Sequence, residues 1–208
     1  MKRVLDRNQD KAHEIRGLLQ EKQVRMYNFI SSPGAGKTAL LEKTCESLSD
    51  KLRIGIIEGD VTTDRDAQRL KKYGLPIVLI NTDGGCHLDS NSIEKALKEF
   101  DLRQLDVLFV ENVGNLVCPS HFDLGETSKI AVVSTSEGDD KPIKYPMLFR
   151  DAEVVILNKT DIMPYTNFNY DAFYEDLRQV NPNVPLFETS CTTGKGLNEW
   201  YEWLVNQF

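Results

Sequence analysis

The sequence predicts an α/β fold, in which a mainly parallel β-sheet is flanked by helices on both faces. Three observations favour this fold. Short apolar runs alternate along the chain with longer amphipathic segments, which is the pattern of βα units. Most apolar runs are rich in Val, Ile and Leu without polar alternation, as is typical of strands buried on both faces. The 208 residues suffice for one domain with a buried core but not for two.

The elements are expected in a regular order. Residues 1–25 are predicted to form an amphipathic helix ahead of a single globular domain of residues 26–208. Strands are predicted at 26–31, 54–58, 77–81, 107–111, 130–134, 154–158 and 186–189. Helices are predicted at 37–48, 64–73, 91–100, near 145–150, and at 171–180 and 197–208. Ligands bind at the carboxyl ends of the strands in such a sheet, so the residues just after those ends are the functional candidates.

Composition restricts the partners and the compartment. The formal net charge of −7, without any basic block, argues against a nucleic-acid partner. No apolar run approaches the roughly 20 residues that a membrane span needs, and the charged N-terminus is unlike a secretory signal. We therefore expect a cytoplasmic protein. Its four cysteines, Cys45, Cys86, Cys118 and Cys191, would stay reduced there, which favours metal-binding or catalytic roles.

A Gly-rich segment, Ser-Ser-Pro-Gly-Ala-Gly-Lys-Thr at 31–38, follows a predicted strand and opens a predicted helix. This is the context of a phosphate-binding loop, whose backbone amides converge on phosphate oxygens. Lys37 would neutralise the outer phosphates, and the Thr38 hydroxyl would bind Mg²⁺. Ser31 replaces the usual first glycine, and the alternative is a plain turn with a surface lysine. We predict a P-loop NTPase whose nucleotide-binding residues here are Pro33, Gly34, Ala35, Gly36, Lys37, Thr38 and Ala39.

The base is predicted from Asn158-Lys159-Thr160-Asp161, an N-K-x-D element that follows a buried strand. The Asp161 carboxylate can accept hydrogen bonds from guanine N1–H and the exocyclic amine, whereas adenine presents the opposite polarity. Lys159 would lie along the base plane. Ser190 and Cys191 lie in a loop whose backbone amide would meet guanine O6, and we interpret Cys191 as a small turn residue and not as a metal ligand. The alternative is a chance tetrapeptide in a helix-capping turn.

Two acidic strand ends supply candidate carboxylates for Mg²⁺. Asp60 follows the second predicted strand, with Asp64 and Asp66 as alternatives behind it, and Glu111 ends the fourth. Gly114 completes an E-x-x-G element whose amide could sense the terminal phosphate. The predicted magnesium ligands are Thr38, Asp60 and Glu111, and the predicted catalytic residues are Lys37, Asp60 and Glu111. No glutamine or arginine stands in an obvious water-positioning place, so we expect the slow hydrolysis of a switch.

A second metal site is predicted from cysteine and histidine near two strand ends. Cys86 and His87 follow the third predicted strand, and Cys118 follows Gly114, beyond what we take to be a neighbouring strand end. Thiolate and imidazole are ligands that Zn²⁺ and Ni²⁺ prefer. Three protein ligands leave a position for water, His121 or a residue of another subunit. The alternative for Cys118 alone is a small buried hydrophobe.

Several of these segments together resemble the HypB family. They are Ser-Ser-Pro-Gly-Ala-Gly-Lys-Thr, Glu-Gly-Asp, Gly-Gly-Cys-His-Leu, Glu-Asn-Val-Gly-Asn-Leu-Val-Cys-Pro, Ser-Glu-Gly-Asp-Asp-Lys-Pro-Ile-Lys-Tyr-Pro and Asn-Lys-Thr-Asp. The resemblance runs from about Tyr27 to the C-terminus, and the Gly-Gly-Cys-His and Val-Cys-Pro elements are specific to the family. The chain lacks the Cys-x-x-Cys-Gly-Cys element and the His-rich tract of some members.

The resemblance implies a GTPase for nickel insertion during [NiFe]-hydrogenase maturation. It implies a SIMIBI-type G domain, a GTP-dependent homodimer, and a nickel or zinc site made by Cys86, His87 and Cys118 near the dimer interface. The implied cofactors are GTP or GDP, Mg²⁺, and Ni²⁺ or Zn²⁺. The implied partners are a HypA-type zinc protein, a nickel-donating chaperone and the hydrogenase large subunit precursor. The role of the segment Asp139–Pro142 stays unassigned.

Three alternatives remain at this point. One is a metallochaperone GTPase for urease or a cobalamin enzyme, although the urease type would carry Cys-Pro-His instead of Gly-Gly-Cys-His. Another is a small-molecule kinase, which Asn158–Asp161 argues against. The last is a structural zinc protein with a vestigial nucleotide fold.

Overall fold

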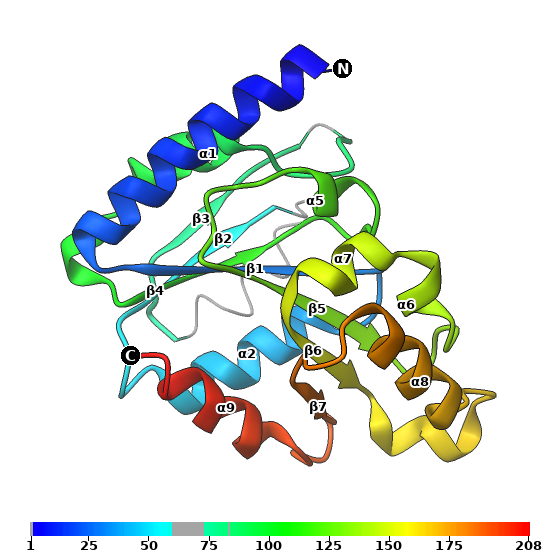
Figure 1. Cartoon of the computed structure of the whole chain (residues 1–208). Coiled ribbons are helices and arrows are strands. Elements are labelled where there is room, and N and C mark those ends of the chain that lie inside the picture. Colours follow the sequence, from blue (N-terminus) through cyan, green and yellow to red (C-terminus); the bar gives the residue numbers. More distant parts are fainter. Residues whose placement is uncertain (1, 60–72, 83) are drawn as a thin grey trace.

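A computed structural model describes residues 2–59, 73–82 and 84–208 of the chain (Figure 1). The predicted helix at 64–73, apart from its last residue, lies outside the described residues, as do Asp60, Asp64 and Asp66. Tyr73 itself lies in a turn.

A seven-stranded sheet runs through the described part of the chain, in the order β3-β2-β4-β1-β5-β6-β7. Every neighbouring pair is parallel. The predicted parallel α/β fold is thereby confirmed. The strands are β1 (Arg25–Ser31), β2 (Ile54–Glu58), β3 (Ile77–Leu79), β4 (Val107–Glu111), β5 (Ser128–Ser134), β6 (Ala152–Asn158) and β7 (Leu186–Glu188).

Helices cover both faces of this sheet (Figure 1). One face packs against α2 and α9, and the opposite face packs against α1 and α4 at one end and α7 and α8 at the other. The α-helices are α1 (Lys2–Lys22), α2 (Lys37–Leu48), α4 (Ser90–Leu97), α5 (Cys118–His121), α6 (Lys141–Lys144), α7 (Pro146–Asp151), α8 (Tyr170–Val180) and α9 (Leu197–Val205). Two 3₁₀ turns are η1 (Leu102–Gln104) and η2 (Thr160–Tyr165).

The central strands are buried on both faces, as the unbroken apolar runs predicted. In β4, all five residues from Val107 to Glu111 are buried, and their side chains alternate between the two faces of the sheet. Trp200 of α9 is fully buried on one face, where its indole N–H donates to the Thr44 hydroxyl at 3.0 Å. This bond satisfies the one polar atom of the largest core side chain, so its burial carries no unpaired donor.

Most predicted bounds differ from the observed ones by only one to three residues. The strands β2 and β4 and the helix α2 have the predicted limits. The predicted helix at 91–100 ends at Leu97 and the one at 197–208 ends at Val205, since each finishes in a frayed turn. The short helices α5 and α6 were not predicted, because four residues are too few to show a 3.6-residue period.

Candidate functional site

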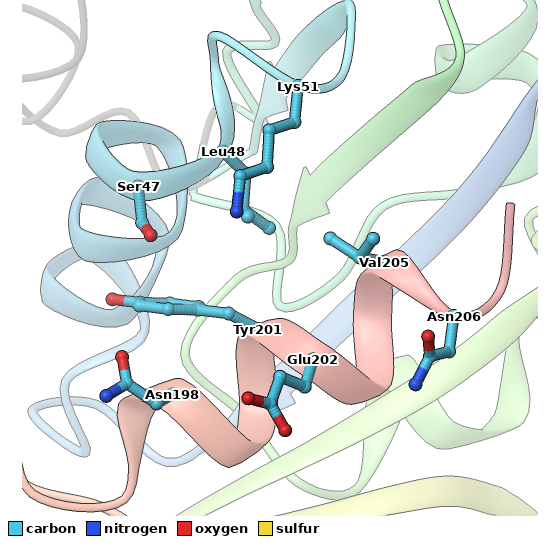
Figure 2. Close-up of a pocket in the computed structure, with 8 residues that line it drawn as sticks. All are labelled: Ser47, Leu48, Lys51, Asn198, Tyr201, Glu202, Val205 and Asn206. Carbon is cyan, nitrogen blue, oxygen red and sulfur yellow. The ribbon is translucent and has the colours of Figure 1, made fainter.

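The carboxyl ends of β1, β4 and β6 bring together most of the residues predicted to bind nucleotide. The phosphate loop connects β1 to α2, Glu111 ends β4, and Asn158 ends β6. An open groove of about 450 Å³ lies elsewhere, between the last turn of α2 and α9 (Figure 2). That groove is at the opposite end of α2 from Gly36, so it is separate from the predicted nucleotide site.

The phosphate loop has the backbone that its glycines predict. Gly34 and Gly36 both have positive φ, of 76° and 98°, and Gly36 caps the N-terminus of α2. A Cβ on Gly36 would lie 2.5 Å from the amide nitrogen of Asn158. Only glycine therefore allows both the left-handed turn and the close approach of β6 to the loop.

Lys37 and Glu111 form a buried charged pair at the phosphate loop, and the half-buried Thr38 contacts it. The Lys37 ammonium donates to the Ser31 hydroxyl at 3.1 Å and lies 4.0 Å from the Glu111 carboxylate. The Thr38 hydroxyl donates to that carboxylate at 2.7 Å. A buried lysine is tolerated only beside compensating groups, and a hydroxyl facing a carboxylate is a suitable oxygen pair for Mg²⁺. The cluster thus fits a magnesium–phosphate group.

A second carboxylate, Glu58, lies next to this cluster and was not chosen from the sequence. It ends β2 directly opposite Glu111 in the parallel register and is buried. Glu58 ends the predicted strand 54–58, but Asp60, the first acid beyond that strand, was chosen as the candidate carboxylate. Asp60 lies outside the described residues, so its predicted role stays a prediction.

Asn158 and Lys159 brace the phosphate loop. The Asn158 amide donates to the Ala35 carbonyl at 3.1 Å, and the Lys159 ammonium donates to the Gly34 carbonyl at 2.6 Å. Lys159 has a left-handed backbone with φ of 61°, and its carbonyl accepts from the Thr135 hydroxyl at 2.6 Å. The N-K-x-D element is therefore joined to the loop and is not an isolated capping turn.

The predicted base-contacting residues lie around Asn158. Asp161 is partly exposed in η2, so its carboxylate is accessible to a ligand. Ser190 is fully buried and Cys191 is half-buried in the loop after β7. The Cys191 thiol donates to the side-chain oxygen Oδ1 of Asn158 at 3.5 Å, and burial raises the pKa of the thiol to about 11. A protonated thiol is consistent with the interpretation of Cys191 as a turn residue.

The structure brings together the three residues of the second predicted metal site. One ligand atom from each of Cys86, His87 and Cys118 lies within 4.8 Å of the others. The hydrogen bond to Cys118, with a smaller effect of burial, raises the pKa of the Cys86 thiol. Burial lowers the pKa of His87, which keeps its ring neutral and able to ligate. Two sulfurs and one imidazole nitrogen suit Ni²⁺ or Zn²⁺, and metal binding would displace the thiol protons.

The expectation that these ligands follow neighbouring strands is wrong. β2 lies between β3 and β4, so the loop carrying Cys86 and His87 must cross the end of β2. It does so over Gly59, where a Cβ would lie 2.5 Å from the Leu88 side chain. The absence of a side chain at Gly59 therefore allows the ligands to meet.

Neighbouring side chains orient the ligands. The His87 ring stacks on Phe122 with ring centroids 3.8 Å apart, and the Asn115 amide donates to the Cys86 carbonyl at 3.4 Å. His121 is exposed, and its Nδ1 lies 2.8 Å from the Val117 carbonyl oxygen. The described ligand cluster does not include His121. The contact of Phe122 with His87 was not predicted, because a single aromatic residue in a loop belongs to no recognisable sequence motif.

The metal cluster and the nucleotide site share one short segment. A Cβ on Gly114 would lie 3.1 Å from Pro33 of the phosphate loop, and Cys118 begins α5 four residues later. A change at the loop that moves Gly114 would therefore act on a segment that carries Cys118 and Asn115.

Lys141 of the unassigned segment also reaches the phosphate loop. Its ammonium donates to the Ser32 hydroxyl at 3.4 Å and lies 3.3 Å from the Glu137 carboxylate. The sequence did not reveal this contact, because the two residues are 109 positions apart.

Among the described residues, no helix combines the length and apolar character needed to cross a bilayer.

A parallel sheet, a phosphate loop with buried Lys37, and an N-K-x-D element define a P-loop nucleotide-binding protein of the α/β class. The family model described as "CobW/HypB/UreG, nucleotide-binding domain" matches residues 26–188. The chain belongs to the HypB family, as its motifs predicted.

Relatives and solved structures support this membership. The hydrogenase maturation factor HypB of Azotobacter vinelandii is 44% identical over 98% of this chain and 67% of its own length. The hydrogenase/urease maturation factor HypB of Helicobacter hepaticus is 45% identical over 90% of this chain and 78% of its own. HypB of Archaeoglobus fulgidus superposes with a TM-score of 0.91 at 35% identity, covering 97% of this chain and 98% of that one. HypB of Helicobacter pylori in complex with nickel gives 0.90 at 38%, covering 97% and 94%.

Gly36→Ala is expected to lower the free energy of unfolding by about 1–2 kcal/mol, the cost of left-handed backbone in a non-glycine residue. It is also expected to weaken GDP binding by about tenfold or more, because the methyl group displaces the Asn158 amide from the phosphate loop. Chemical denaturation and GDP titration measure the two effects.

Gly74→Ala is the matched control, since Gly74 has φ of 66° and open space around its Cβ position. It should lose similar stability and keep wild-type GDP affinity. Equal GDP affinity in both variants would contradict the packing argument.

Proposed function

We propose that this chain is a GTP-hydrolysing metallochaperone that couples its nucleotide state to nickel binding and delivery during [NiFe]-hydrogenase maturation. The observation that carries the proposal is the proximity of two sites. Cys118 lies four residues from Gly114, which packs on the phosphate loop, and close to Cys86 and His87. The names of the relatives, as hydrogenase maturation factors, and the nickel complex of one of them support the same function.

The nucleotide half of the proposal assigns each group a role. Asp161 selects guanine, and the loop from Pro33 to Ala39 binds the phosphates. Thr38 and Glu111, with Asp60, hold Mg²⁺, which neutralises phosphate charge when bound. Lys37 is buried beside Glu111, so contacts within the protein direct its charge into the site.

The metal half assigns Cys86, His87 and Cys118 as nickel ligands, with zinc as the competing ion. Three ligands leave the ion incompletely enclosed, which suits a site that passes metal on. Cys86 is exposed, so an incoming or outgoing ligand can reach the ion. Nickel binding and nucleotide state then influence each other equally, because coupling between two sites is reciprocal.

The partners follow from family membership. We propose a GTP-dependent homodimer that works with a HypA-type zinc protein, a nickel-donating chaperone and the hydrogenase large subunit precursor. A urease client is the second candidate, since one relative is named as a hydrogenase/urease factor.

Nickel titration in GDP and in a non-hydrolysable GTP analogue tests the coupling. Wild-type protein is expected to bind nickel with a Kd that differs between the two nucleotides by about fivefold or more. Cys118→Ala should raise the Kd in both states by more than about tenfold, because a ligand is lost.

Cys45→Ala is the control thiol, since Cys45 is fully buried in the core between α2 and the sheet. It should leave the nickel Kd unchanged. Equal nickel Kd in GDP and the analogue would refute the switch, and unchanged affinity in Cys118→Ala would refute the site.

Lys141 supplies a second positive charge at the phosphate loop. The Glu137 carboxylate and the Ser32 hydroxyl hold its ammonium at the loop, and it is mostly buried there. Lys141→Ala is expected to lower kcat for GTP hydrolysis by about 10²-fold while GDP affinity changes little, because the charge acts on the transferring phosphoryl group. Single-turnover hydrolysis of GTP, with ATP as the comparison, measures this.

Lys98→Ala removes an exposed lysine that directly follows α4 and should retain wild-type kcat. A Lys141→Ala variant that hydrolyses GTP at the wild-type rate would remove Lys141 from the mechanism.

A further inference from the structure

Two loops carry the proposed nickel ligands, and two buried asparagines join them. The ligand loops are residues 84–90, with Cys86 and His87, and residues 112–123, with Cys118. Asn112 joins the loops on the side of the sheet, and Asn8 joins them on the side of α1. Neither asparagine belongs to the ligand cluster.

Asn112 is fully buried and connects the inner flanks of the two loops. Its side-chain oxygen accepts from the Leu88 amide at 3.2 Å and from its neighbour, the Val113 amide, at 2.9 Å. Leu88 directly follows His87, and Val113 directly precedes Gly114. The Asn112 side-chain nitrogen donates to the Asn28 side chain of β1 at 3.0 Å, which fixes the amide orientation.

Asn8 connects the outer flanks of the same loops from α1. Its side-chain oxygen accepts from the Ser90 amide at 2.9 Å, and its side-chain nitrogen donates to the Asp123 carbonyl at 2.7 Å. The Ser90 hydroxyl donates back to the Asn8 carbonyl at 3.0 Å. Only 4% of Asn8 is exposed, so water cannot readily replace these bonds.

Buried amides of this kind hold backbone in one geometry. The bonds to Leu88, Ser90 and Asp123 satisfy main-chain groups of the two loops, so both loops stay where the asparagines place them. The stack of His87 on Phe122 is a further contact between the loops, with His87 on one loop and Phe122 on the other. The side chains of Asn8 and Asn112, which are not among the proposed ligands, therefore set the distance between the two ligand-bearing loops.

We propose that Asn8 and Asn112 are positioning residues of the nickel site. Asn8 fixes the separation of the two loops in both nucleotide states. Asn112, which follows Glu111 directly, also transmits movement of the segment before Gly114 to the loop carrying Cys86 and His87. This inference rests on the proposed nickel function.

The test is nickel titration of Asn8→Ala and Asn112→Ala in GDP and in a non-hydrolysable GTP analogue. Asn8→Ala should raise the nickel Kd about 10–100-fold in both nucleotides, as losses of outer hydrogen bonds around metal ligands do. Asn112→Ala should also weaken nickel binding, and it should abolish the difference in Kd between the two nucleotides. The thiolate-to-nickel charge-transfer absorption of both nickel-saturated variants should shift, because the ligand geometry changes.

Two controls separate positioning from general destabilisation. Gln9→Ala removes a surface contact to the Asp123 carboxylate, 3.0 Å away, from the same helix, and should keep the wild-type Kd. Leu204→Ala opens the core beneath α9 on the other sheet face and should lower thermal stability without changing nickel affinity. Asn112→Asp keeps the oxygen that accepts from Leu88 and Val113, so it should recover part of the nickel affinity lost in Asn112→Ala.

The inference is overturned if Asn8→Ala and Asn112→Ala, both folded by thermal melting, bind nickel within twofold of wild type while Cys118→Ala does not. It is also overturned if Leu204→Ala loses as much nickel affinity as the asparagine variants. Failure of wild-type protein to bind nickel would overturn the proposed function, and this inference with it.

Discussion

Gly114 packs tightly against Pro33, where a Cβ on Gly114 would lie 3.1 Å from the proline, and the proposed link between the two sites depends on this contact. It places the end of β4 against the phosphate loop, with Glu111 beneath Thr38 on one side. On the other side the chain continues within four residues to Cys118. Because packed interiors change between discrete arrangements and do not deform smoothly, occupancy of the phosphate loop can alter the metal site without a long pathway.

Contacts between the protein's own residues hold both halves of the site. Lys37 and Glu111 compensate each other's burial, so the charge that receives phosphate is already oriented. Asn158 and Lys159 hold the phosphate loop from β6. The metal ligands are held by a ring stack and by backbone hydrogen bonds to buried amides. Such preorganisation confines the response to a small rearrangement of the segment between the two sites.

The sequence predicted the fold and much of the candidate site, because those features depend on local pattern. Unbroken apolar runs predicted β2 and β4. The location of Cys86, His87 and Cys118 after the carboxyl ends of strands predicted that they would lie together. The features it missed depend on contacts between distant residues. Asn8 forms a hydrogen bond with Asp123, which is 115 positions away in the sequence, and Lys141 forms one with Ser32, 109 positions away. The position of β2 between β3 and β4 was not predicted either, because the order of strands in a sheet does not follow their order in the sequence.

Nickel K-edge X-ray absorption of the nickel-loaded protein tests the central claim most directly, because it observes the metal's ligands while the nucleotide is changed. With GDP bound, the spectrum should contain two sulfur ligands and at least one imidazole nitrogen. Exchange for a non-hydrolysable GTP analogue should change the number or distance of the sulfur ligands. Superimposable spectra in the two nucleotide states would contradict the claim that the phosphate loop moves Cys118.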